Sequence, residues 1–190
     1  MKKRSYRMAR RAESSAETRA RIVEAAIALH EEIGPKATTI SAIAERAGVQ
    51  RLTVYRHFPD EASLFQACSS GWYERNPLPD FEALEGSGRQ ACREGLTALY
   101  RYYSGTQGMW TSVLRDAPDM PVLAAPQERY RRFLLELAQT LVERIRPAPS
   151  REAFVGTTLA HAVRFATWRS LEEAGLSDDE KADLVMAWLD

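Results

Sequence analysis

Apolar residues recur at helical spacing along most of the chain, and between residues 38 and 65 they form two short patterns that meet at a glycine. In the first pattern the apolar residues follow i, i+3, i+4 and i+7, which is one face of a helix: Ile40, Ile43, Ala44 and Ala47. Thr39 precedes this face as a candidate cap, and Gly48 suits a left-handed helix end. A second helix follows, with Val54 and Phe58 on one side. The pattern predicts a helix-turn-helix of the kind that reads DNA.

The opposite side of the second helix carries side chains that can reach outward. The guanidinium of Arg51 matches guanine O6 and N7 in the major groove, a contact worth about 1–3 kcal/mol of discrimination. The amide of Gln50 matches adenine by the same geometry, and Leu52 and Thr53 suit a thymine methyl group or a phosphate. We therefore expect a recognition helix in which Arg51 is the main base-reading residue.

The segment AERAGVQRLTVYRHFPDEASLF resembles the DNA-binding region of the TetR/AcrR family of transcriptional regulators. The resemblance covers roughly residues 14–72 and is strongest at Gly48–Val49 and at Thr53–Phe58. Gln50 departs from the family pattern, which commonly has Ser there. Glu61 stands where the family commonly has a Lys that touches a phosphate, so we expect Glu61 to weaken the hold on DNA. Glu61 can instead serve only the positive N-terminus of its own helix.

The resemblance implies an all-α fold with an N-terminal three-helix DNA-binding domain and a C-terminal helical domain for ligand binding and dimerisation, about nine helices in total. It also implies phosphate contacts from Thr39, Tyr55 and His57, with Ser41 as a further candidate. Phosphate contacts position a protein on DNA without reading its sequence. Tyr55 equally fits packing with only its hydroxyl group exposed.

Charge is divided unevenly between the two ends of the chain. The whole sequence has 26 basic and 26 acidic residues, whereas residues 1–60 carry twelve Lys and Arg against seven Asp and Glu. Residues 1–13 lack an apolar face and hold six of the basic residues: Lys2, Lys3, Arg4, Arg7, Arg10 and Arg11. We expect a flexible basic arm that lies on phosphates or enters a minor groove. A solvated tail that serves only solubility is the alternative.

The order of breaks along the chain suggests two domains. Ser14 and Glu17 form a candidate capping box that opens the first helix. Asn76–Pro79 and Gly86–Gly88 interrupt the helical pattern, so the boundary is expected between about residues 72 and 87. We predict a DNA-binding domain with its linking helix over residues 14–72, and a second domain over residues 73–190. Helices are expected there over residues 89–103, 107–115 and 122–145.

The helix expected over residues 150–174 has two distinct faces. One face is aromatic and is expected to point inward, and it carries Phe154, Thr158, His161, Phe165 and Trp168. The opposite face carries small residues that allow close approach of another helix, and Ser177 and Glu180 form a capping box that opens a last apolar helix. The resemblance implies a homodimer through a four-helix bundle of these two helices. The expected interface residues are Gly156, Ala160, Val163, Leu184, Val185 and Trp188.

The resemblance further implies a small-molecule cavity between the helices of the second domain. Candidate ligand-binding residues are the aromatic side chains and the histidine expected inside this domain: Tyr100, Tyr103, Trp110, Phe133, His161, Phe165 and Trp168. An apolar cavity with a few polar groups is typical of ligand sites. The same residues equally fit an ordinary helical core, and His161 fits a satisfied core histidine.

Little in the sequence favours catalysis. The three histidines belong to different predicted helices, and there is no HExxH motif, no CxxC pair and no glycine-rich phosphate loop. We therefore expect no catalytic residues, no metal site and no cofactor. Cys68 and Cys92 are expected to be reduced thiols. No signal sequence is apparent and no run reaches about 18 apolar residues, so a cytoplasmic protein without a membrane span is expected.

Together these features predict a homodimeric DNA-binding transcriptional regulator that a small apolar or aromatic ligand releases from a palindromic operator. The resemblance alone implies that it is a repressor. Two alternatives remain open. The chain can be a constitutive DNA-binding regulator without a ligand. It can also be an all-α small-molecule-binding protein or enzyme with a vestigial helix-turn-helix.

Overall fold

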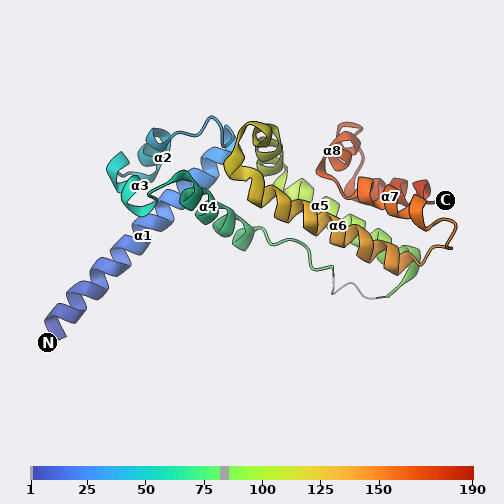
Figure 1. Ribbon diagram of the computed structural model, residues 1–190, viewed down its shortest axis with the longest axis horizontal. Coiled ribbons are helices and arrows are strands. Elements are labelled where there is room, and N and C mark those ends of the chain that lie inside the picture. Colours follow the sequence, from blue (N-terminus) through green and yellow to red (C-terminus); the bar gives the residue numbers. More distant parts are fainter. Residues whose placement is uncertain (1, 82–85) are drawn as a thin grey trace. The chain divides into compact units, whose positions relative to one another are not determined.

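The computed structural model describes residues 2–81 and 86–190, with the backbone alone for residues 2–7 and 9. This part of the chain contains nine α-helices, two short 3-10 helices and no strand, which confirms the all-α fold (Figure 1). It divides into two compact units. The first holds the residues up to Asn76 together with Thr111–Ala124, and the second holds Pro77–Trp110 together with Ala125–Asp190. Residues 111–124 were expected in the second domain, but the structure places them in the first unit.

The first helix, α1, runs from Lys2 to Glu32 and starts earlier than predicted. Residues 2–13 are therefore helical, whereas a flexible arm was expected. The predicted capping box is also wrong, because the Ser14 carbonyl accepts a hydrogen bond from Thr18 at 2.8 Å inside the helix. Ala, Arg, Met and Glu have high helix propensity, and extending an existing helix needs no new nucleus. The segment can thus be helical without an apolar face.

α1 packs against the helices α2 (Ile40–Ala47), α3 (Arg51–His57) and α4 (Glu61–Arg75). Its inward stripe is formed by Ile22, Ala26 and Leu29, which are all buried. Ile33 follows Leu29 at the same helical spacing, but it is 43% exposed. The reason is that Gly34, with φ +91°, turns the chain away just after the helix.

The turn after α1 is fixed to the C-terminal end of α5 (Gly88–Asp116) within the first unit. Asp116 Oδ2 accepts a hydrogen bond from the Lys36 backbone N–H at 3.0 Å, and Arg115 donates to both Asp116 oxygens and to the Ile33 carbonyl. A Cβ on Gly34 would lie 2.0 Å from Arg115 Nη2 and 2.4 Å from Asp116 Oδ2. This turn therefore requires glycine both for its positive φ and for its close packing.

α5 is a single helix, whereas two helices separated near residue 105 were predicted. Its buried stripe passes through the predicted break, since Leu96, Leu99, Tyr103 and Trp110 follow i, i+3, i+7 and i+14. Burial of Trp110 on this stripe outweighs the cost of the two glycines at 105 and 108, about 1 kcal/mol each relative to alanine.

The remaining helices of the second unit are α6 (Ala124–Ile145), which begins in the first, and α7 (Glu152–Ala162), α8 (Phe165–Glu173) and α9 (Asp178–Trp188). A single helix was predicted over the range of α7 and α8. The chain breaks between them because Arg164 is extended, with φ −75° and ψ 140°. The predicted capping box at the start of α9 is confirmed by the hydrogen bonds between Ser177 and Glu180.

The break between α7 and α8 is stabilised by hydroxyl groups from outside these helices. Tyr100 donates to the Ala162 carbonyl at 2.9 Å, and Tyr103 donates to the Val163 carbonyl at 2.8 Å. Carbonyl groups that lose helical partners are costly when buried without a hydrogen bond. The two tyrosines of α5 therefore compensate for the interrupted helix.

Candidate nucleic-acid interface

The turn between α2 and α3 has the geometry that the sequence predicted. Thr39 Oγ1 accepts a hydrogen bond from the Ala42 backbone N–H at 3.1 Å and caps α2. Gly48 adopts the left-handed conformation, with φ 65° and ψ 40°, and the Val49 N–H donates to the Ala44 carbonyl at 2.9 Å. Val54 is completely buried, so this face of α3 is fixed in the core of the unit. The opposite face of α3 is thereby turned outward.

The outward face of α3 presents most of the residues expected to contact DNA. Gln50 and Arg51 are exposed, Leu52 is 68% exposed and Tyr55 is 46% exposed. Thr39 and Ser41 are exposed at the start of α2, whereas Thr53 and His57 are half-buried. An apolar side chain as exposed as Leu52 gains from a partner surface that excludes water. Contact of these residues with DNA stays a prediction.

Free cations on this surface are fewer than the sequence suggests. Arg46 forms a two-pronged ion pair with Glu32, at 2.6 and 2.7 Å, and Lys36 pairs with Asp119. Within residues 2–81 and 86–190, neither Arg51 nor Arg56 forms an ion pair. These two guanidinium groups of α3 are therefore available for bases or phosphates.

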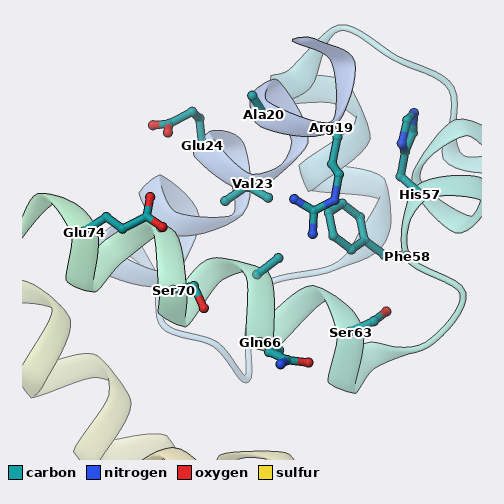
Figure 2. A pocket seen from close by; sticks show the side chains of 12 residues that line it. Arg19, Ala20, Val23, Glu24, His57, Phe58, Ser63, Gln66, Ser70 and Glu74 are labelled. Carbon is teal, nitrogen blue, oxygen red and sulfur yellow. The ribbon is translucent and has the colours of Figure 1, made fainter. Parts of the chain in front are cut away.

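A groove of about 530 Å³ beside the C-terminal end of α3 was not expected from the sequence. It lies between α1 and α4, with His57 at its edge (Figure 2). The guanidinium of Arg19 lies 4.8 Å from the centre of the Phe58 ring, which it covers (Figure 2). This contact and the burial of Phe58 fix the end of α3 against α1.

The structure brings together most of the candidate ligand-binding residues in the second unit. Tyr103 is the centre of the cluster, with ring centroids 5.3 Å from Phe165, 5.9 Å from Trp168 and 6.4 Å from Trp110. These side chains and Tyr100 are all at least 96% buried. Burial, together with the neighbouring Tyr130, holds the pKa of Tyr103 well above its ordinary value. The hydroxyl group of Tyr103 therefore stays protonated and acts as a donor to Val163.

Two candidate ligand-binding residues lie elsewhere. His161 is exposed, because Val155, Leu159 and Ala162 form the buried face of α7 and turn His161 outward. The predicted inward position of His161 is therefore wrong. Phe133 is half-buried, and its ring centroid lies 5.7 Å from that of Phe81.

The predicted dimer face is corrected in the same way. Val163 and Val185 are buried within the unit itself, so they belong to its core. Gly156 and Ala160 are half-buried. Three large apolar side chains remain exposed on α7 and α9: Phe154 at 52%, Leu184 at 37% and Trp188 at 36%. Phe154 was expected to point inward, but the break after Ala162 gives α7 a different buried face.

A buried lysine is the main feature of the second unit that the sequence did not reveal. Lys181 is 1% exposed, and its Nζ donates to Glu172 Oε2 at 2.5 Å and to Asp178 Oδ1 at 2.9 Å. Asp178 also accepts hydrogen bonds from Ser104 and Trp168. Burial alone would lower the pKa of Lys181, but its two carboxylate partners raise it above the ordinary value. The group therefore joins α5, α8 and α9 by charge and hydrogen bonds.

In the described ranges no group of three His, Cys, Asp or Glu side chains is placed to hold a metal ion. No helix in those ranges has the length and apolarity needed to cross a membrane. Cys68 and Cys92 are free and buried, and burial raises the pKa of each thiol to about 12. Neither thiol has the low pKa of a reactive cysteine.

Comparison with known proteins relates the region around the helix-turn-helix to one family. Residues 22–68 match the model described as "Bacterial regulatory proteins, tetR family". The regulator TtgR of Pseudomonas putida is 44% identical over 62 residues, which are 33% of this chain and 30% of TtgR. The match thus spans less than a third of that relative.

Solved structures extend the likeness of the fold to nearly the whole chain. A TetR-like transcriptional regulator from Rhodococcus sp. RHA1 has a TM-score of 0.65 at 20% identity, over 90% of this chain and 93% of its own. NalD, the secondary repressor of the MexAB-OprM multidrug efflux pump in Pseudomonas aeruginosa, has a TM-score of 0.59 at 21% identity, over 93% of this chain and 95% of its own. At such identities the likeness concerns the fold alone.

Proposed function

We propose that the chain is a TetR-family DNA-binding transcriptional regulator, and that it acts as a homodimeric repressor that a small apolar or aromatic effector releases from a palindromic operator. We assign DNA binding to residues 14–72, and effector binding and dimerisation to residues 73–190. The observation that carries the proposal is the outward face of α3, where Arg51 and Leu52 are exposed at the end that would enter a major groove.

Base reading and positioning fall to different residues in this proposal. Arg51 reads guanine and Gln50 reads adenine, while Leu52 and Thr53 contact a thymine methyl group or a phosphate. Thr39, Ser41, Tyr55 and His57 contact phosphates and fix the position of α3. Exposure of Thr39 and Ser41 beside α3 supports this division.

Replacing Arg51 with alanine is expected to lower discrimination at one base pair by about 1–3 kcal/mol, because a two-pronged contact to one guanine is lost. The measurement is a fluorescence anisotropy titration of the variant against a panel of single-base operator changes at fixed salt. Full discrimination by the Arg51→Ala protein at every position would contradict the assignment.

Deletion of residues 2–11 serves as the matched comparison. This change removes charge from the first turns of α1 and leaves α3 intact. It should weaken operator and random DNA alike and make the dependence of log K on log salt shallower by about 0.9 per lost phosphate contact. Loss of sequence preference in the deleted protein would show that this segment reads bases.

We further propose that the effector binds in the second unit, at the cluster around Tyr103, Phe165 and Trp168. The cluster is apolar and rich in aromatic rings, and Tyr100 and Tyr103 tie it to the break between α7 and α8. A ligand that pushes these rings apart would also disturb the tyrosine hydrogen bonds that stabilise the break. Binding energy would change the conformation of the unit at this interrupted helix.

Effector binding is expected to lower operator affinity roughly 5–150-fold, which corresponds to couplings of about 1–3 kcal/mol. Because such coupling is reciprocal, operator DNA should weaken effector binding by the same factor. A screen of apolar and aromatic compounds by tryptophan quenching, followed by titration with and without operator, measures both effects. Phe165→Ala should change effector affinity while ligand-free operator binding stays nearly intact. Bound compounds that leave operator affinity unchanged would favour a constitutive regulator.

We infer that the chain is not an enzyme. His30, His57 and His161 belong to three different helices, α1, α3 and α7, and His161 is exposed. The named relatives are transcriptional regulators or repressors. Retarded migration of a palindromic DNA fragment separates the proposed regulator from an all-α ligand-binding protein or enzyme, which would leave the fragment unshifted.

A further inference from the structure

A cavity of about 250 Å³ lies inside the first unit, between the helix-turn-helix and its supporting helices. It is bordered by α1, α2, α3 and α4 and by the turn that follows α1. Its inner wall is apolar and includes Ile43, Phe58, Leu64 and Phe65, which are all buried. A small cavity with an apolar wall and a few polar groups is the usual form of a ligand site.

His30 supplies a polar group to this wall. Its side chain is 5% exposed, and its ring stacks on Phe65 with centroids 5.0 Å apart and an interplanar angle of 11°. Its ring forms no hydrogen bond with the residues that the structure describes, and its nitrogens are not among the fully buried, unsatisfied polar atoms of those residues. A ring nitrogen therefore keeps some access to solvent, and a ligand partner in the cavity that His30 lines could bond to it.

The protonation state of His30 indicates what that partner can be. Burial lowers its pKa to about 4, although the nearby Asp116 carboxylate acts in the opposite direction. The ring is therefore neutral near pH 7 and offers one N–H donor and one nitrogen acceptor. A neutral hydroxyl group can use either of them.

The rim of the cavity carries negative charge. Asp60 and Glu61, at the start of α4, both line it, and no Lys or Arg belongs to its wall. Asp60 Oδ1 accepts a hydrogen bond from the Ser63 N–H at 2.7 Å, which caps α4. Among the described residues neither carboxylate forms an ion pair. The rim therefore favours a cation and disfavours an anion.

Size and spacing limit the ligand further. An engineered protein cavity of about 150 Å³ binds benzene, so about 250 Å³ is sufficient for one ring with a short side chain. Glu61 and Phe65 are four residues apart on α4, about one helical turn, and His30 stacks on Phe65. A ligand with a hydroxyl group at one end and an ammonium group at the other can span this distance.

We propose that this cavity binds a small phenolic amine, with its ring between Phe58, Leu64 and Phe65. The phenol hydroxyl group hydrogen-bonds to His30, and the ammonium group lies beside Asp60 and Glu61. The site belongs to the DNA-binding unit and is separate from the effector cluster around Tyr103. Tyr55 also lines the cavity, so occupancy should alter operator binding. That last step alone depends on the proposed function.

Calorimetric titration of the full-length protein without DNA tests the site with three probes that share one ring. Tyramine carries both groups, 2-phenylethylamine lacks the hydroxyl group, and 3-(4-hydroxyphenyl)propionate replaces the ammonium group with a carboxylate. Tyramine should bind about tenfold or more tightly than the propionate, because the acidic rim attracts the ammonium group of tyramine and repels the carboxylate of the propionate. Equal binding of the amine and the acid would overturn the proposal, as would no binding of tyramine up to about 10 mM.

Variants separate the two polar contacts. Asp60→Asn combined with Glu61→Gln removes the charge but keeps an asparagine cap on α4, and it should reduce the preference for tyramine over the propionate to about threefold or less. Glu136→Gln, on an exposed position of α6, is the matched control and should leave that preference unchanged. His30→Leu should remove the advantage of tyramine over 2-phenylethylamine while keeping the apolar wall.

A further pair of variants locates the bound amine. Ile40→Phe, at a half-buried position of the cavity wall, should block all three probes, whereas Leu135→Phe, at an exposed position of α6, should block none. Thermal unfolding of each variant checks that the fold is intact. If Phe165→Ala weakens tyramine and the His30 and Asp60 variants do not, the amine binds in the second unit and the proposal is wrong. Because no DNA is present, this result does not depend on whether the protein is a repressor.

Discussion

Replacing Lys181 with alanine is expected to lower the free energy of unfolding by about 3–5 kcal/mol. Lys181 is almost completely buried, and its Nζ lies within hydrogen-bonding distance of Glu172 and Asp178 and 5.4 Å from the centre of the Trp168 ring. Removing the cation leaves the Asp178 carboxylate, 15% exposed, without its main opposite charge. Urea unfolding at pH 7 measures the change.

A methionine at position 181 separates the charge from the packing. Lys181→Met keeps most of the aliphatic volume, so it leaves little cavity. The free energy of unfolding that this variant loses therefore reports mainly the carboxylates left without their cation. Adding Asp178→Asn to Lys181→Met should recover part of the stability, because the double variant removes both buried charges. If the free energy of unfolding of Lys181→Met falls by less than about 1 kcal/mol, solvent already stabilises the carboxylate of Glu172, whose side chain is 43% exposed.

The cost of losing Lys181 should depend on pH in a definite direction. Burial acts to raise the pKa of Asp178, but hydrogen bonds from Lys181, Ser104 and Trp168 lower it below its ordinary 3.8. A carboxyl group whose pKa is lower in the folded state contributes stability above its unfolded pKa and loses it as the pH falls through its folded pKa. The difference between the wild-type protein and Lys181→Met should therefore be full at pH 7 and shrink below about pH 4.

The helix-turn-helix was predictable because its signals are local. Thr39 and Asp60 cap helices through residues three positions away, at Ala42 and Ser63. Gly48 ends α2 by its own backbone conformation. None of these contacts requires knowledge of a distant part of the chain, so the sequence pattern alone was sufficient for the elements around the outward face of α3.

The break between α7 and α8 could not be predicted for the opposite reason. No proline or glycine marks residues 163 and 164, and the apolar pattern continues through them. The break depends on Tyr100 and Tyr103, whose partners are about sixty positions away in sequence. The break gives α7 a different buried face from the one predicted for a single helix. The predicted inward positions of Phe154 and His161 were wrong for this reason.

Buried polar groups were missed because their sequence context is that of a surface. Lys181 follows a run of acidic residues in the first turn of α9, which is typical of a solvated helix start. His30 precedes two glutamates at the end of α1. Each is buried through contacts with other helices, Trp168 of α8 in one case and Phe65 of α4 in the other.

Introducing arginine at Ala160 is expected to convert the proposed dimer to monomers and to lower operator affinity by about 10²–10⁴-fold. The small side chain of Ala160 leaves room for a second helix on α7, and Leu184 and Trp188 of α9 are exposed. A long charged side chain at Ala160 would fill that room and bury a charge without a partner. Light scattering at micromolar protein gives the mass, and anisotropy titration gives the affinity.

The size of the expected loss follows from the operator geometry. A twofold axis sets two α3 helices about 34–36 Å apart, or a multiple of one turn, so a dimer places both on one palindrome. After one α3 is bound, the second binds from a high effective concentration, and a monomer loses this advantage entirely. Binding of a single half-site should therefore change little in Ala160→Arg, because α3 itself is intact. Gln139→Arg, which adds the same charge at an exposed position of α6, should leave both mass and affinity unchanged. A dimeric Ala160→Arg protein with full operator affinity would place the twofold axis on another surface of the second unit.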